Sequence, residues 1–305
     1  MFKYTLDNKR YHTLNYFFKN KFNSKVFKVG LNANFNCPNF KNGTGCIFCS
    51  NGSGNNFQHV DLIEQFNLVK IPLDKKWPNS KYIAYFQANS NTYAPVSVLK
   101  EKYEKVLNIP NVIGLSIATR SDCLTDEILD YLSDLNKKTF LTVEIGLQSM
   151  HDETLKLINR GHDLQSFEDA IKKLKQRNIF TVVHIINGLP YETKDMMVDT
   201  AKYLNSLDIN GIKIHMLYVT KNTKLAEMYQ EEPFHILTKD EYIDIVCEQL
   251  RYLNENIVVE RITGDPIKEE LIEPNWLLKK FCVLNDIDKE MKKRDIYQGD
   301  KVIIP

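Results

Sequence analysis

Short apolar runs rich in β-branched residues alternate along the chain with stretches of helical periodicity. The sequence predicts six strands: 25–33, 81–88, 112–119, 140–147, 179–186 and 210–217. Strands that alternate with helices in this way pair in parallel, and the helices cover the faces of the sheet. Six such units are fewer than the eight of a closed (β/α) barrel. We therefore expect an α/β fold in the form of an open, partial (β/α)6 barrel.

The alternation changes at about residue 221. Beyond it the sequence predicts one strand at 256–262 and helices near 223–230, 238–253, 267–272 and 275–292. We interpret this part as an α-rich extension packed on the barrel. The expected organisation is a basic and aromatic segment (1–24), the partial barrel (25–220) and the C-terminal extension (221–305).

The first 30 residues are strongly basic, although the formal net charge of the whole chain is only +1. Seven lysines and arginines stand there against Asp7, and several aromatic residues lie among them. Such a mixture suits contact with a nucleic-acid backbone and stacking on bases. It equally suits the polar and apolar faces of one surface helix, so both interpretations stay open.

The chain lacks sequence signals for a membrane or for export. No apolar run approaches the roughly 18–20 residues that span a bilayer, and charges interrupt the N-terminus, unlike a signal peptide. We therefore expect a cytoplasmic protein with no membrane partner. In that compartment clustered cysteines indicate a metal site rather than disulfides. The isolated Cys123, Cys247 and Cys282 are expected to be buried thiols.

Three cysteines lie in one loop directly after the first expected strand. Cys37, Cys46 and Cys49 have the spacing C-x8-C-x2-C, and clustered thiolates are soft ligands that suit zinc or an iron–sulfur cluster. A structural zinc takes four protein ligands, and no CxxC or HxxxH follows to supply the fourth. A [4Fe–4S] cluster bound by three cysteines leaves one iron open to a small molecule. The pattern favours the cluster, with zinc as the alternative.

This loop, with Phe48 just before its last cysteine, resembles the cluster loop of the radical S-adenosylmethionine (SAM) enzymes. The usual first gap is three residues, and longer gaps like this one occur in the branch that includes the Elongator catalytic subunit. The resemblance implies a [4Fe–4S] cluster on Cys37, Cys46 and Cys49. It also implies SAM as a second cofactor, cleaved to methionine and a 5′-deoxyadenosyl radical, and a flavodoxin- or ferredoxin-type electron donor.

Polar side chains stand at or near the ends of all six expected strands, where parallel barrels place their active sites. We expect these residues to bind SAM: Gln87, Asn89, Arg120, Glu144, Gln148, Arg160 and Asn187. By resemblance, Gln148 lies near the ribose and Arg160 pairs with the SAM carboxylate. Lys213 and His215 alternate on the sixth strand and so point to one face. A lysine there is either paired structurally or used on substrate. We favour use, and expect both residues to be catalytic.

The C-terminal extension narrows the resemblance. The segments 259–266, 273–280 and 294–299 resemble those of a compact bacterial radical SAM family. That family is similar to the Elongator catalytic subunit but lacks its acetyltransferase domain. The resemblance implies a tRNA partner. We expect its phosphate backbone to be held by basic groups: the N-terminus, 172–177 and 292–294. It also implies modification of the wobble uridine, converting a carboxymethylaminomethyl group to an aminomethyl group.

Two alternatives remain at this point. The first keeps the radical chemistry but acts on a small molecule or a protein. The second is a zinc-stabilised RNA-binding protein without radical chemistry.

Overall fold

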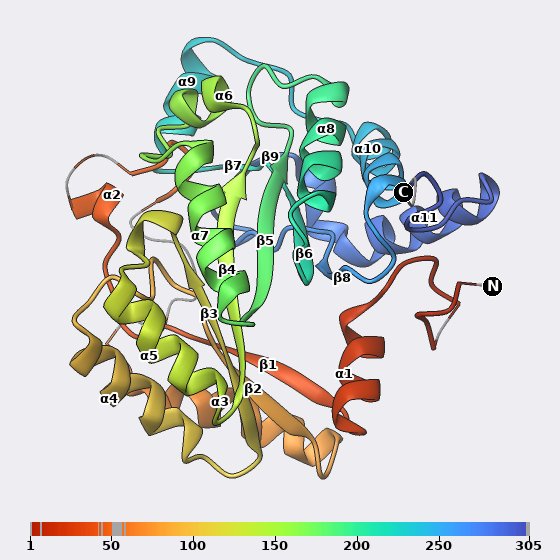
Figure 1. Ribbon diagram of the computed structural model, residues 1–305. Coiled ribbons are helices and arrows are strands. Elements are labelled where there is room, and N and C mark those ends of the chain that lie inside the picture. Colours follow the sequence, from red (N-terminus) through yellow and green to blue (C-terminus); the bar gives the residue numbers. More distant parts are fainter. Residues whose placement is uncertain are drawn as a thin grey trace.

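A computed structural model describes residues 2–6, 8–41, 43, 45–50, 57 and 59–302. Its centre is a curled sheet of seven parallel strands in the order β1-β2-β3-β4-β5-β6-β8 (Figure 1). The strands are β1 (Val26–Leu31), β2 (Lys81–Phe86), β3 (Val112–Thr119), β4 (Phe140–Gln148), β5 (Phe180–Asn187), β6 (Gly211–Met216) and β8 (Val258–Arg261). The expected α/β partial barrel is confirmed, and the sheet gains a seventh strand.

Amphipathic helices follow the strands and cover one face of the sheet (Figure 1). They include α3 (Leu62–Lys76), α4 (Val96–Leu107), α5 (Asp126–Asn136), α7 (Leu164–Gln176) and α8 (Lys194–Asn205). Polar residues cap their N-termini, as at α7, where the Asp163 side chain accepts a hydrogen bond from the Ser166 amide at 2.9 Å. The apolar side of each helix is buried. In the described residues, no helix has the length and apolar character needed to cross a membrane.

The seventh strand comes from the C-terminal part of the chain. β8 pairs with β6 in parallel, with Ile212 opposite Val259. A second, two-stranded sheet joins β7 (Val219–Thr220) to β9 (Leu271–Glu273) in antiparallel orientation. The helix expected near 267–272 is therefore wrong, because this segment is a turn that leads into β9. Pro274 disfavours a helical conformation for the residue before it, and pairing with β7 stabilises the extended form.

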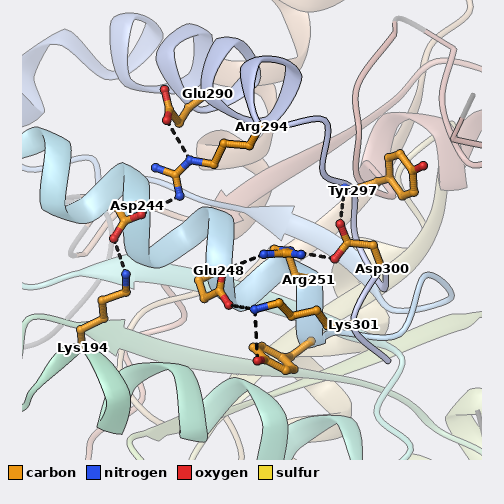
Figure 2. Close-up of polar contacts among 10 residues, drawn as sticks. Lys194, Asp244, Glu248, Arg251, Glu290, Arg294, Tyr297, Asp300 and Lys301 are labelled. Carbon is orange, nitrogen blue, oxygen red and sulfur yellow. Dashed lines mark hydrogen bonds and ion pairs between the residues drawn. The ribbon is translucent and has the colours of Figure 1, made fainter. Parts of the chain in front are cut away.

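Charged side chains join the C-terminal helices to one another. The elements concerned are α8, α10 (Lys239–Tyr252), α11 (Lys280–Lys293) and the turn that follows α11. Figure 2 shows this network, which contains Lys194, Asp244, Glu248, Arg251, Glu290, Arg294, Asp300 and Lys301. Asp244 accepts from both Lys194 and Arg294 and so links α8 and α11 through α10. The remaining elements of this part are α9 (Lys224–Glu231) and the 3-10 helix η2 (Asn275–Lys279).

The N-terminal segment contacts both edges of the sheet. Its helix, α1 (Leu14–Phe22), lies beside β1, and Thr13 forms a parallel bridge to Val259 in β8. The Phe17 ring lies 5.1 Å from that of Phe180 and 6.3 Å from that of Phe140. These aromatic rings therefore pack against the sheet, as the two-faced surface helix predicts. Base stacking by these rings is not supported.

Candidate active site

The cysteine loop follows β1 at the carboxyl end of the sheet. It is held by the turn between α6 (Asp152–Leu157) and α7. The Asn39 amide donates to the Asn159 carbonyl at 2.7 Å, and the Asn159 amide donates back to the Gly45 carbonyl at 2.6 Å. The Ile47 amide donates to the Ile158 carbonyl at 3.0 Å. These reciprocal contacts fix the loop over the ends of the strands.

Two of the three cysteines interact directly. Cys46 is buried, whereas Cys37 and Cys49 are half-buried. A hydrogen bond from the Cys49 thiol lowers the pKa of Cys46 to about 5, although burial opposes this, and the nearby Arg160 adds to the lowering. The same hydrogen bond and burial raise the pKa of Cys49 well above its ordinary value. Cys46 is therefore a thiolate at neutral pH, the form that binds metals.

Two buried arginines lie beside the thiols. Arg160 Nη1 is 3.7 Å from Cys46 Sγ, and Arg160 Nη2 donates to the Gly146 carbonyl at 2.6 Å. Arg120 Nη1 donates to the Arg160 carbonyl at 2.8 Å, and its Nη2 pairs with Asp122 at 2.7 Å. Arg160 Nε is buried and has no partner among the described residues. The site thus holds positive charge and one unused donor next to the sulfur atoms.

Gly146 is the reason why two predicted SAM-binding residues meet. A Cβ atom at this position would lie 2.5 Å from Gln148 Nε2 and 2.8 Å from Arg160 Nη2. Any larger residue would displace one of them. Gln148 at the end of β4 and Arg160 from the turn after α6 can therefore both approach residue 146 only because it has no side chain.

The donor set fits an iron–sulfur cluster. In the described part of the chain, no group of three or more His, Cys, Asp or Glu side chains is arranged as a site for a metal ion. The chemistry of the loop is nevertheless that of a cluster site: three sulfur donors, one of them a thiolate, beside a guanidinium that offsets negative charge. No fourth cysteine or histidine from the described residues joins them.

The structure also locates the remaining predicted SAM-binding residues. The backbone amide of Gln87 donates to the Leu31 carbonyl at 3.1 Å, and the side chain of Asn89 donates to the Phe35 carbonyl at 2.9 Å. Both contacts tie the loop after β2 to the start of the cysteine loop. The side chain of Asn187 exchanges two hydrogen bonds of 2.8 Å with Gln249 of α10. Direct contacts of these residues with SAM stay predictions.

Glu144 lies in the barrel interior and accepts hydrogen bonds from four side chains. Lys28 Nζ is 2.9 Å from Oε1, and the Ser116 hydroxyl donates to the same oxygen at 2.5 Å. His184 Nε2 is 2.6 Å from Oε2, which also accepts from Lys213 Nζ. These donors come from β1, β3, β5 and β6, so their convergence on β4 defines the concave face of the sheet.

A second carboxylate completes this cluster of charges. Glu260 of β8 lies 2.5 Å from Lys28 Nζ and 3.6 Å from Lys213 Nζ. The Lys28–Glu260 pair joins the two edge strands across the open side of the barrel. We call Lys28, Glu144, His184, Lys213 and Glu260 the interior ion cluster. Lys213, predicted to act on substrate, is thus also paired structurally.

Burial and charge oppose each other in the interior ion cluster. Burial alone would raise the pKa of Glu144, but Lys213, Lys28 and the His184 hydrogen bond hold it well below its ordinary value. Burial lowers the pKa of His184, although the hydrogen bond that the ring donates to Glu144 acts in the opposite direction. Burial also lowers the pKa of His215 well below its ordinary value, and the nearby His184 adds to this. Glu144 is therefore ionised and both histidines are neutral at neutral pH.

Sequence reasoning missed Lys28, Ser116 and Glu260. The signal was present for Lys28, which stands between the apolar residues of a short strand that must be largely buried. A charge in such a position requires a buried partner, but the partner cannot be identified from the sequence because it lies 116 or 232 residues away. The expectation for Cys282 was wrong, because its side chain is exposed on α11, whereas Cys123 and Cys247 are buried.

A curled parallel sheet with three cysteines at its carboxyl end is the arrangement of a radical SAM domain. The model of the Radical SAM superfamily matches residues 36–204, more than half of the chain, and that of the Radical_SAM C-terminal domain matches residues 209–293. The chain belongs to the radical SAM superfamily. The predicted resemblance is confirmed.

The chain is also similar to individual proteins. The uncharacterized protein YtqA of Bacillus subtilis (strain 168) is 47% identical and the match covers 98% of this chain and 94% of YtqA. A tRNA uridine(34) acetyltransferase of Methanocaldococcus infernus is 25% identical over 50% of this chain and 29% of its own length. The structure of M. infernus Elp3 with an N-terminal deletion superposes with a TM-score of 0.70 at 19% identity, covering 90% of this chain and 64% of that one. This last likeness shows the shared fold.

Proposed function

We propose that the protein is a tRNA-modifying radical SAM enzyme. It acts on the side chain of the wobble uridine and converts a carboxymethylaminomethyl group to an aminomethyl group. The observation that carries the proposal is the similarity to a tRNA uridine(34) acetyltransferase over about half of this chain. The chain aligns with YtqA over nearly its full length, and it is similar to a domain of that acetyltransferase rather than to the whole of it.

In this proposal Cys37, Cys46 and Cys49 bind the [4Fe–4S] cluster. The predicted SAM-binding residues are Gln87, Asn89, Arg120, Glu144, Gln148, Arg160 and Asn187. When bound, the two cofactors supply the one-electron cleavage of SAM that starts hydrogen-atom abstraction. Arg160 balances negative charge beside Cys46 and, with Gln148, presents donors at the end of β4. Lys213 and His215 are the predicted catalytic residues in the barrel interior.

The surface suggests where the tRNA backbone binds. In the cluster expected at 172–177, Lys173, Lys175 and Arg177 each pair with an aspartate, at 3.1, 2.8 and 2.9 Å. A hollow of about 730 Å³ between α10, η2 and α11 is a stronger candidate. Lys239, Lys279 and Lys289 line it together with a single acid, Asp286. Lys239 and Lys289 share this one carboxylate, at 2.6 and 3.3 Å, so the three lysines exceed the acid by two charges. Excess positive charge of this kind favours phosphate.

The test uses protein reconstituted anaerobically with iron and sulfide, then given SAM, dithionite and tRNA from a strain that lacks the gene. We expect 5′-deoxyadenosine, loss of the carboxymethylaminomethyl nucleoside and gain of the aminomethyl nucleoside by mass spectrometry. Cys46→Ala should produce none of these. 5′-Deoxyadenosine without any change in the tRNA nucleosides would point to another substrate. Zinc without acid-labile sulfide would support the zinc-stabilised alternative.

Binding of tRNA is tested separately. Counterion release predicts that affinity falls steeply as salt rises, by about tenfold or more between 50 and 200 mM when several phosphates are contacted. Lys279→Ala should reduce the slope of log affinity against log salt by about one. The matched control is Lys175→Ala, a lysine already paired with Asp208 on the surface. Equal slopes in both variants would exclude the hollow between α10 and α11.

A further inference from the structure

One member of the interior ion cluster remains accessible. The side chains of Glu144 and Glu260 are 0% and 2% exposed, and those of Lys213 and Lys28 are 8% and 12% exposed. His184 has the largest exposed fraction, 17%. Its ring centroid lies 5.4 Å from that of His215. A molecule entering the barrel interior would therefore meet the imidazole of His184 more readily than the charges behind it.

The hydrogen bond to Glu144 fixes the proton on the His184 ring. An ionised carboxylate only accepts hydrogen bonds, so Nε2, 2.6 Å from Glu144 Oε2, carries a proton. Among the described residues, Glu144 is the hydrogen-bond partner of this ring. In the neutral imidazole, Nδ1 then keeps a free lone pair. A carboxylate behind an imidazole whose second nitrogen is open is the arrangement of an oriented general base.

Burial keeps this base in its neutral form. Glu144 of β4 and His215 of β6 lie beside the His184 ring. Lys213 of β6 and Lys28 of β1 pair with Glu144, and Glu260 of β8 pairs with both lysines. Burial lowers the pKa of His184, the hydrogen bond that its ring donates to Glu144 raises this pKa, and Lys213 lowers it again, with a net lowering. At neutral pH the lone pair on Nδ1 is therefore available.

We propose that His184 is a proton acceptor for the substrate in the barrel interior and removes a proton from a cationic amine. This inference rests on the proposed function, in which the uridine side chain contains a secondary amine that is protonated at neutral pH. The N–H bond breaks, the electron pair stays on the amine nitrogen, and the proton moves to His184 Nδ1. Glu144 stabilises the resulting imidazolium. The neutral amine then stabilises a radical on an adjacent carbon, which an ammonium group cannot do.

The experiment compares the reconstituted wild type with His184→Gln between pH 5.5 and 9. Two rates are measured: nucleoside conversion in tRNA, and 5′-deoxyadenosine formation without tRNA. His235→Gln is the matched control, because His235 also pairs with a glutamate, Glu241 at 3.0 Å, but lies on the surface. A general base contributes about 10²–10⁴-fold, so His184→Gln should lose about 100-fold or more of the conversion rate. It should retain its cluster and its SAM cleavage without tRNA.

The pH profile gives a second readout. Protonation of His184 removes the base, and its pKa lies below the ordinary value of 6.5. The wild-type conversion rate should therefore fall on the acid side below about pH 6.5, and this fall should be absent from the residual activity of His184→Gln. His184→Ala should regain conversion when imidazole is added, which separates lost chemistry from lost folding.

Each outcome decides the inference. Wild-type conversion by His184→Gln with an unchanged pH profile would overturn it. Loss of the cluster and of SAM cleavage in both His184 variants, without rescue by imidazole, would assign His184 to structural support only and would also overturn it. If the wild type makes 5′-deoxyadenosine but converts no nucleoside, the proposed function fails first and this inference fails with it.

Discussion

The substitution Lys213→Met tests whether the interior ion cluster stabilises the fold. Methionine keeps most of the length of lysine but removes the charge. Glu144, which has no exposed side-chain area, then faces a single cation, Lys28 at 2.9 Å. Removing one partner of a buried ion pair costs about 3–5 kcal/mol. Because Lys28 remains, we expect a loss near the lower end of this range, about 3 kcal/mol of unfolding free energy.

The effect should depend on pH in a defined direction. The folded-state pKa of Glu144 lies well below its ordinary value of 4.5. Its ion pairs therefore stabilise the fold fully above pH 4.5, and this contribution is lost as the pH falls through the folded-state pKa. The difference between wild type and Lys213→Met should be largest at pH 7 and should shrink below pH 4.5.

Urea unfolding of the cluster-free protein, followed by far-UV circular dichroism at pH 7 and pH 4, measures both quantities. Lys175→Met is the control, because Lys175 pairs with Asp208 at 2.8 Å on the exposed surface. Exposed pairs contribute about 0–1 kcal/mol. A loss at pH 7 no larger than that of the control would refute the electrostatic argument.

Three further predictions concern the site. Gly146→Ala should weaken SAM binding with little loss of stability, because the new Cβ would lie 2.5 Å from Gln148 Nε2 and 2.8 Å from Arg160 Nη2, the movable ends of two flexible side chains; calorimetric titration with SAM and urea unfolding measure these effects. Arg160→Gln should raise the pKa of Cys46 from about 5, seen as slower alkylation of the cluster-free protein by iodoacetamide at pH 6, and an unchanged rate would contradict this. Asn187→Ala should cost about 1–3 kcal/mol because the buried Gln249 Oε1 loses its donor, although Gln249 Nε2 keeps its bond to the Met197 carbonyl. Thermal unfolding would show this loss, and a variant as stable as wild type would contradict the reasoning.

Local patterns were sufficient to predict the sheet and the cysteine loop. The six strands before residue 221 are short and flanked by loops and helices, so their period and length identify them. The strand expected at 256–262 was confirmed, but the sequence did not predict which strand it pairs with. The pairing of Val259 with Ile212 depends on tertiary packing. The helix expected near 267–272 failed for the same kind of reason, since pairing with β7 outweighs local propensity.

The polar contacts of the site were less predictable than its position. Cys46 and Arg160 could be assigned to one site because their motifs are distinctive. Lys213 binds Glu144, which lies 69 positions away in the sequence, and Asn187 binds Gln249, which lies 62 positions away. A single sequence contains no signal for such pairs. Sequence reasoning therefore identified polar residues in the barrel but could not separate those that pair with each other from those left open to a ligand.

The attachment of the N-terminal segment has a consequence for synthesis of the protein on the ribosome. The His12 backbone amide donates to Gln298 Oε1 at 2.8 Å, and the Gln298 backbone amide donates to the Arg10 carbonyl at 2.9 Å. Thr13 forms a bridge with Val259. Residues 10–13 therefore meet these partners only after translation has continued to Val259 and then to Gln298. Until then the edge of β6 that receives β8 lacks its final neighbour. Nascent chains of this protein are expected to need protection from premature association until these C-terminal partners emerge.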